Sequence, residues 1–98
     1  MTRWTLIFSS LYLADLRELP IFDRARVQAS VATSLGDEPD RPGRHRRPLK
    51  SPVSWCPEAT WRLRIGEYRV FYRLENGCAE VLRVRLKGRR TTEEMGPR

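Results

Sequence analysis

Basic side chains recur at every second position in the last third of the chain. They are Arg62, Arg64, Arg69, Arg73, Arg83, Arg85 and Lys87, with Phe71 in their midst. Alternate residues of a β-strand share a face, so these cations are expected together on one face of a sheet. A guanidinium donates two parallel hydrogen bonds to a phosphate, so this face predicts a polyanion site in which Phe71 could stack a base. The alternative interpretation is that the arginines extend into water and only keep the face soluble.

A second basic stretch lies in residues 36–57, which hold five of the seven prolines. No helical or strand periodicity survives there, so a long loop is predicted. Its basic residues and its histidine are Arg41, Arg44, His45, Arg46, Arg47 and Lys50. The loop is either a solvated linker or a contact with phosphates, and the sequence leaves both interpretations open.

The uneven charge favours a polyanionic partner. The 98 residues include 19 basic and 12 acidic ones, which gives a net charge of +7. Residues 1–40 carry a net charge of −2, whereas residues 41–98 carry +9. A chain of this length is expected to form one domain over residues 1–98, with a tail over residues 91–98 and no room for a separate cofactor domain.

Metal and membrane functions are not expected. Cys56 and Cys78 are too few and too far apart for a zinc site, and His45 is the only histidine. A disulfide between the cysteines is conceivable, but two free thiols fit a cytosolic chain better. There is no apolar run of about 18 residues and no recognisable signal peptide. These features predict a cytoplasmic protein without metal or cofactor.

The N-terminal third predicts a strand followed by two helices. Residues 4–8 are typical of a buried strand, and Ser9 or Ser10 offers an N-cap for a helix over residues 11–19 that Pro20 ends. A second helix is predicted over residues 21–35, closed by Gly36. Its inner stripe is predicted to be Val27, Val31 and Leu35, widened by Phe22, Ala25, Ala29 and Ala32.

Residues 60–65, 68–74 and 80–87 alternate as three antiparallel strands. Gly66-Glu67 fits a two-residue type II′ turn between the first two. A two-residue turn at Asn76-Gly77 would pair Val70 with Arg83 and mix the two faces, whereas a three-residue loop over residues 75–77 pairs Val70 with Leu82. The three-residue loop is therefore the predicted register. The predicted fold class is α+β, with an N-terminal strand, a two-helix hairpin and a three-stranded antiparallel sheet whose apolar face the helices cover. A capping box is predicted at Thr91 and Glu94.

The stretch Trp-Arg-Leu-Arg-Ile-Gly-Glu-Tyr-Arg-Val-Phe-Tyr over residues 61–72 is distinctive. It resembles the central β-hairpin of the RelE/ParE superfamily of bacterial toxins from type II toxin–antitoxin systems. The resemblance extends over nearly the whole chain, through residues 10–20, the Pro-Leu-Lys of residues 48–50 and the basic tail of residues 87–90. It implies the RelE-like fold, a basic face that enters the ribosomal A site and cuts mRNA, and a labile antitoxin that masks this face.

The resemblance also assigns roles to residues. Arg69 corresponds to the family's phosphate-binding arginine, and Arg62 and Arg64 correspond to basic residues on the preceding strand. Arg89 falls near the family's basic residue after the last strand, and His45 lies close to where some relatives place an acid or base. These five are the candidate catalytic residues. The candidate RNA-binding residues are Arg73, Phe71, Arg83, Arg85, Lys87, Arg46, Arg47 and Lys50.

The C-terminus departs from the family. Many endonuclease members carry a Tyr or His there, where this chain reads Thr-Thr-Glu-Glu-Met over residues 91–95. RNA cleavage by the 2′-hydroxyl needs a base and an acid, and arginine does not titrate near neutral pH. The remaining candidates for proton transfer are His45, Glu58, Glu67, Glu93 and Glu94. The resemblance predicts a ribosome-dependent mRNA endonuclease. The alternatives are a ParE-like inhibitor of DNA gyrase and a non-catalytic member that binds RNA or an antitoxin.

Overall fold

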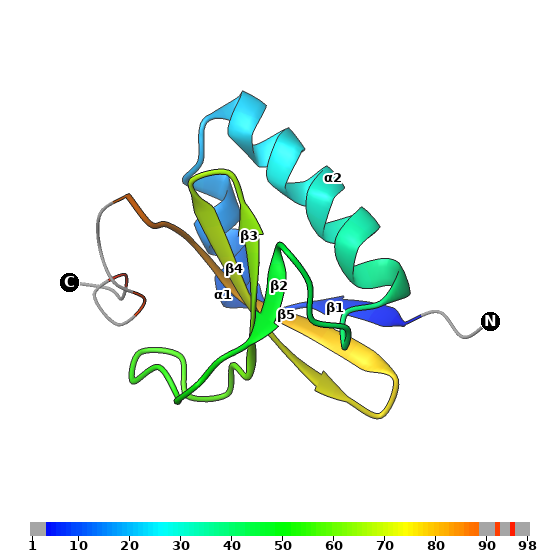
Figure 1. The fold of residues 1–98 in the computed structure, drawn as a ribbon. Coiled ribbons are helices and arrows are strands. Elements are labelled where there is room, and N and C mark those ends of the chain that lie inside the picture. The colour runs from blue at the N-terminus through cyan, green and yellow to red at the C-terminus, as the bar shows by residue number, and fades with distance from the viewer. Residues whose placement is uncertain (1–3, 89–91, 93–94, 96–98) are drawn as a thin grey trace.

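The computed structural model describes residues 4–88, 92 and 95, and its fold is α+β, as predicted (Figure 1). In chain order the elements are β1 (Thr5–Phe8), α1 (Ser10–Arg17), α2 (Ile21–Asp37), β2 (Arg46–Pro48), β3 (Trp61–Ile65), β4 (Tyr68–Glu75) and β5 (Cys78–Leu86). All the strands join one sheet in the order β1-β5-β4-β3-β2, in which β1 runs parallel to β5 and the other neighbours are antiparallel. The sheet therefore has two strands more than the predicted three-stranded one, with β1 and β2 as its edges.

Three residues fix the helical hairpin. The Ser9 hydroxyl accepts a hydrogen bond from the Tyr12 N–H at 3.1 Å, which confirms Ser9 as the N-cap of α1. Pro20 stands at the N-cap of α2, where its missing N–H costs nothing. The Arg24 guanidinium donates to the carbonyls of Arg17 and Leu19 at 3.0 and 3.1 Å. The end of α1 is thereby tied to the first turn of α2.

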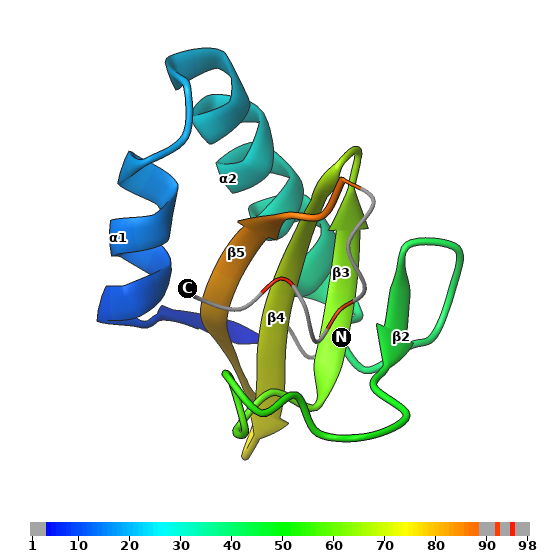
Figure 2. The same cartoon turned by 90° about the vertical axis from the view of Figure 1, so that its left-hand side faces the viewer.

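The helices cover one face of the sheet and enclose the main core (Figures 1 and 2). The inner stripe of α2 is confirmed, since Val27, Val31 and Leu35 are fully buried. Its predicted widening is wrong: Phe22 is 90% exposed, and all three alanines are exposed as well. With 3.6 residues per turn, Phe22, Ala25 and Ala29 fall roughly opposite the stripe.

Both hairpins turn through two residues. Gly66 has φ +58° and Glu67 has no positive φ, in agreement with the predicted type II′ turn. The predicted three-residue loop between β4 and β5 is wrong, because Glu75 pairs directly with Cys78. Asn76 and Gly77 have φ angles of +50° and +77°, the two positive values that a type I′ turn requires.

A β-bulge repairs the register that this turn sets. Tyr72 pairs with Val81, but Phe71 pairs with Arg83, so Leu82 is an extra residue in β5. Beyond the bulge Val70 pairs with Val84, and both are buried among the core residues of the helical face. The bulge, rather than a longer loop, therefore keeps the apolar side chains on one face of the sheet and the basic ones on the other.

A second, smaller core lies on the opposite face of the sheet. Residues 49–59, here called the covering loop, fold over the lower part of this face in Figure 2. Val53, Cys56, Ala59 and Met95 are buried around Phe71, which is 0% exposed. The prediction that Phe71 stacks a base is therefore wrong, since no surface of its ring is accessible. The same contacts order much of the proline-rich segment predicted to be a loop, which also contains β2.

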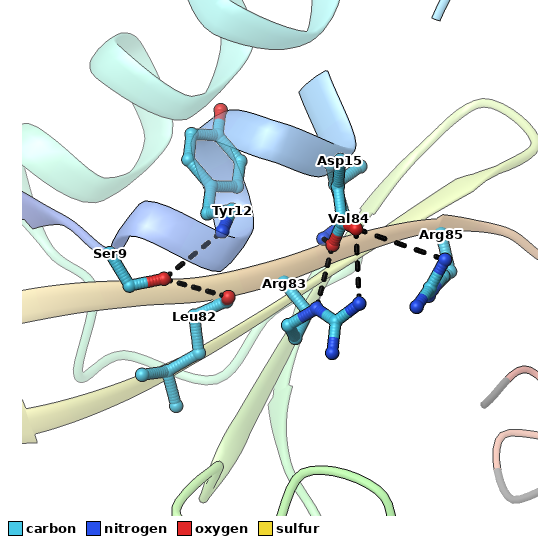
Figure 3. A network of polar contacts seen from close by, with 7 residues as sticks. All are labelled: Ser9, Tyr12, Asp15, Leu82, Arg83, Val84 and Arg85. Atoms are coloured by element: carbon cyan, nitrogen blue, oxygen red, sulfur yellow. Dashed lines mark hydrogen bonds and ion pairs between the residues drawn. The ribbon is translucent and has the colours of Figure 1, made fainter. Parts of the chain in front are cut away.

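The free edge of β5 is closed by α1 rather than by a strand. β1 pairs with β5 only as far as Val81. Past that point the Ser9 hydroxyl donates to the Leu82 carbonyl at 2.9 Å, and the Asp15 carboxylate accepts from the Val84 N–H at 3.2 Å (Figure 3). The same carboxylate accepts two hydrogen bonds from Arg83, at 2.7 and 3.0 Å. Two side chains of the helical hairpin thus satisfy backbone groups that would otherwise be open at the bulge.

The Asp15–Arg83 pair is expected to be a major contributor to stability. Its side chains are only 10% and 12% exposed, so Asp15→Ala leaves a buried guanidinium and a backbone N–H without their acceptor. We expect a loss of about 3 kcal/mol in the free energy of unfolding, measured by urea denaturation. The control is Glu38→Ala, which removes the exposed ion pair with Arg41 and should cost less than about 0.5 kcal/mol. Equal costs for the two variants would contradict the assignment.

Candidate nucleic-acid interface

Four arginines gather on the upper part of the face opposite the helices. They are Arg47, Arg62, Arg64 and Arg69, here called the arginine patch, and they come from β2, β3 and β4. Arg47 pairs with Arg62 across β2 and β3, and Arg64 pairs with Arg69 across β3 and β4. Like charges directly opposite each other on neighbouring strands destabilise a sheet unless an anion separates them. The patch is therefore expected to attract anionic ligands.

The pKa values of two arginines in the patch reflect this repulsion. Burial lowers the pKa of Arg62, and the nearby charges of Arg47, Arg69 and Arg64 lower it further. Burial and the charge of Arg64 also lower the pKa of Arg69, although Glu67 acts in the opposite direction. No ion pair joins a carboxylate to any of the four among the residues that the structure describes. A phosphate placed here would offset the repulsion between the guanidiniums and would accept hydrogen bonds in place of water.

Arg69 is held more rigidly than its neighbours. One of its terminal nitrogens donates to the carbonyls of Gly66 and Tyr68, both at 2.9 Å. Its Nε–H is buried and has no hydrogen-bond partner. The guanidinium is thus fixed to the β3–β4 turn through Nη1, while Nη2 makes no hydrogen bond with the residues that the structure describes. A preorganised arginine of this kind loses little side-chain entropy when it binds a phosphate.

A pocket of about 330 Å³ opens beside the patch, between β2, β3 and the covering loop. Arg47, Lys50 and Arg62 line it together with Leu49 and Thr92. Arg62 donates to the Thr92 hydroxyl at 2.9 Å, which orients the guanidinium at the pocket wall. The pocket therefore combines three cations with a hydroxyl, a set suited to a phosphate.

The candidates for proton transfer are spread around the patch. His45 lies at its edge, because its carbonyl accepts from the Arg64 N–H at 2.7 Å, and it is exposed. Glu67 sits in the turn next to Arg69, whereas Glu58 belongs to the covering loop. Glu93, Glu94 and Arg89 lie outside the described residues, as does the capping box predicted at Thr91 and Glu94.

Several of the other residues predicted to contact RNA already bind carbonyl or carboxylate groups of the protein itself. Arg46 lies on the helical side, where it donates to the carbonyls of Arg41 and Ser34 at 3.1 and 3.4 Å. Arg73 pairs with Glu75 and Glu80 at 3.0 and 2.6 Å. Arg83 and Arg85 both face the Asp15 carboxylate, at 2.7 and 3.8 Å (Figure 3). Lys87 follows β5 directly, and its backbone N–H donates to the Glu67 carbonyl at 2.8 Å. Of the predicted RNA-binding residues, the structure brings Arg47 and Lys50 to the patch.

Trp55 is an organising residue that the sequence analysis missed. Its ring packs edge-on against Phe71, with centroids 5.0 Å apart, and lies within about 6 Å of the guanidiniums of Arg83 and Arg85. Its indole N–H donates to the Thr92 carbonyl at 3.1 Å. Trp55 thus connects the covering loop, the sheet and the C-terminal segment. One sequence pattern could have indicated this packing. Apolar residues stand among the prolines of this segment, namely Val53, Trp55 and Ala59.

The described residues contain no cluster of His, Cys, Asp and Glu able to hold a metal ion, and both cysteines are free thiols. Within the same residues, no helix is long and apolar enough to cross a membrane. What this arrangement can do is hold phosphates and stabilise negative charge that develops on them.

Comparison with known proteins bears on the family and the fold of this chain. A family profile described as "ParE toxin of type II toxin-antitoxin system, parDE" matches residues 6–90. No curated protein sequence matches the chain. Among solved structures, the chain resembles one in the toxin–antitoxin complex RelBE2 from Mycobacterium tuberculosis, with a TM-score of 0.70, 27% identity, and coverage of 85% of this chain and 96% of that one. It shares the fold of the archaeal RelE–RelB complex from Pyrococcus horikoshii OT3, with a TM-score of 0.66, 20% identity, and coverage of 91% and 99%.

The patch is expected to bind nucleic acid mainly through phosphates. For Arg62→Ala we expect weaker binding of a single-stranded uridine oligonucleotide and a salt dependence, log Kd against log salt, that is shallower by about 0.7. Fluorescence anisotropy across a salt series measures both. Arg41→Ala is the matched control, because it removes the same charge from an exposed residue already paired with Glu38. Equal loss in both variants would show that only net charge matters.

Proposed function

We propose that this chain, which belongs to the ParE toxin family of type II toxin–antitoxin systems, is an endoribonuclease that cleaves mRNA on the ribosome. The observation that carries the proposal is the arginine patch, where four cations from three adjacent strands lie without a carboxylate partner in the described part of the chain. Attack by a 2′-hydroxyl on the adjacent phosphate adds negative charge to that phosphate. Fixed guanidiniums stabilise this charge as it develops.

Each arginine of the patch has a part in this reaction. Arg69, fixed to the turn by two carbonyls that bind Nη1, holds a non-bridging oxygen of the scissile phosphate with the N–H groups of Nη2. Arg64 lies exposed beside Arg69. The attraction between its guanidinium and the phosphate increases as the pentacovalent phosphorus forms. Arg62 and Arg47 hold the neighbouring phosphate at the pocket with Lys50. Arg89 remains a candidate from the sequence.

His45 is the residue proposed to move the proton. It is the only histidine, and its backbone is hydrogen-bonded to Arg64, inside the patch. An imidazole can both accept and donate a proton, whereas the guanidiniums of the patch stay charged. His45 would take the proton from the 2′-hydroxyl or give one to the departing 5′-oxygen.

The proposed partners follow from the family and from the charge. A type II toxin acts together with an antitoxin, and the structural neighbours are toxin–antitoxin complexes. A cognate antitoxin that covers the patch would neutralise it and prevent RNA from binding. The ribosome and its mRNA are the proposed targets, which places the action in the cytoplasm.

A second candidate function is inhibition of DNA gyrase without catalysis. Two observations favour it: the family profile is that of ParE, and the described tyrosines do not reach the patch. Tyr12, Tyr68 and Tyr72 all lie in the core on the helical side. Tyr68, for example, donates to Asp23 of α2 at 2.6 Å, and burial together with this bond raises its pKa to about 12. These tyrosines therefore supply no acid or base to the patch.

The two functions are separated by mapping new mRNA 5′ ends after induced expression in bacteria. For the wild-type chain we expect ends clustered within translated codons, and for Arg69→Ala we expect their loss together with the growth arrest. Arg41→Ala, at equal expression, should behave as wild type. Growth arrest with intact mRNA and blocked supercoiling would instead identify the gyrase inhibitor. Unchanged cleavage by Arg69→Ala would contradict the proposed role of the patch.

Proton transfer by His45 has its own test. We expect His45→Gln to slow cleavage by about 100-fold while leaving RNA affinity unchanged, because the phosphate contacts stay in place. Cleavage rates are measured on programmed ribosomes, and RNA affinity is measured separately. A normal cleavage rate would assign proton transfer to another group.

A further inference from the structure

A second pocket, of about 300 Å³, lies on the other side of the covering loop, between that loop, β5 and the start of α1. Its composition differs from the first pocket: Glu58 and Glu80 meet Arg73 and Arg83 around an apolar surface. Nothing in the proposed phosphate chemistry uses these residues. We propose that this pocket binds an unpaired guanine base of the RNA whose backbone the arginine patch holds, an inference that rests on the proposed function.

The apolar surface of the pocket suits a flat ring. Trp55 forms one wall, and Leu82 and Leu11 form others. Leu82 is the bulge residue of β5, and Leu11 is 58% exposed at the start of α1. Single-stranded RNA is recognised by bases that leave the stack and pack against aromatic and apolar side chains while their edges are hydrogen-bonded.

The polar groups of the pocket are largely fixed, with one exception. Arg73 is bound to Glu80 at 2.6 Å and to Glu75 at 3.0 Å, and Arg83 is held by Asp15 at 2.7 Å. Glu58 forms no hydrogen bond or ion pair with the residues that the structure describes, and it is exposed at the rim. Its two carboxylate oxygens are thus the free acceptors of the pocket, with the Arg73 guanidinium as a neighbouring positive charge.

Two free acceptors side by side select one base. The Watson–Crick edge of guanine presents two adjacent donors, N1–H and the 2-amino group, which a carboxylate accepts together as it does the fork of an arginine. The corresponding edges of adenine, cytosine and uracil place an acceptor next to each donor, and that acceptor would face the Glu58 charge. Guanine also presents O6, which accepts from a guanidinium such as that of Arg73.

The position of the pocket favours a base over a basic side chain of a protein partner. Arg73 and Glu80 pair across β4 and β5 on the same face of the sheet as the patch, so one RNA strand lying on this face can meet both. The chain as a whole carries a net charge of +7, which attracts RNA and repels cationic peptides.

The test compares guanosine 5′-monophosphate with inosine 5′-monophosphate, which differ only in the 2-amino group. Titrations are followed by NMR on the isolated, isotope-labelled chain, so the result does not depend on ribosomes or cleavage. We expect guanosine monophosphate to bind about tenfold more tightly, with shifts at Leu82 and at the Trp55 indole. We expect Glu58→Gln to abolish this preference and to leave the weak binding of both nucleotides to the arginine patch. Glu18→Gln, which changes an exposed carboxylate at the end of α1, is the matched control and should keep the preference.

Equal affinity for the two nucleotides, or a preference that survives Glu58→Gln, would overturn the inference. Selective shifts of the pocket residues by N-acetylarginine amide, with none by guanosine monophosphate, would also overturn it and assign the pocket to a basic side chain of a protein partner. If guanine binds as expected but no mRNA is cut in cells, the pocket stands and the endonuclease proposal fails. The two failures are therefore distinguishable.

Discussion

Repulsion between arginines on neighbouring strands is the constraint around which this structure is arranged. Arg69 has an arginine opposite it on each side, Arg64 on β3 and Arg85 on β5. Arg85 and Arg83 are compensated by Asp15, and Arg73 is compensated by two glutamates. The arginines left over are the four of the patch. Among the residues that the structure describes, the site is thus defined as much by the lack of a carboxylate partner as by the cations themselves.

Asp15 has a double role in this arrangement. Its carboxylate neutralises the part of β5 nearest to α1, and it also accepts from the Val84 N–H where β1 has ended. Because one group serves both purposes, the position of α1, the bulge at Leu82 and the limit of the patch are coupled. A helix that moved away from the sheet would open a strand edge and leave two partly buried guanidiniums without their carboxylate at once.

Much of the fold could be predicted from residue patterns. The alternation in β3 and β4 predicted the hairpin, and Val27, Val31 and Leu35 predicted the buried stripe of α2. The bulge could not be predicted in the same way. Val81 and Leu82 are consecutive apolar residues, and only the presence of a second core on the far side explains why both are sheltered. β2 has no alternation of its own, since three residues that include a proline become a strand only because β3 offers a free edge.

The candidate site was predictable in part for the same reason. Arg62, Arg64 and Arg69 could be assigned to one face from periodicity. Which arginines form ion pairs depends instead on Asp15, Glu75 and Glu80. The sequence does not mark these acids, because they are distant in sequence or look like any other acidic residue. Phe71 illustrates the opposite error. A phenylalanine among arginines was interpreted as a stacking platform, whereas it is the centre of a small core built by Val53, Cys56 and Met95.

The parallel pairing of β1 with β5 has a consequence for how the chain is made. Thr5 pairs with Cys78 and Phe8 with Val81, so the first strand finds its neighbour only after most of the chain has been synthesised. β5 is also the strand that α1 closes and that carries the bulge, and the second core requires Met95, close to the end. Contacts so distant in sequence form late in folding. A nascent chain therefore carries the arginines of the patch out of the ribosome before the complete sheet can form, because β5 is synthesised after every residue of the patch.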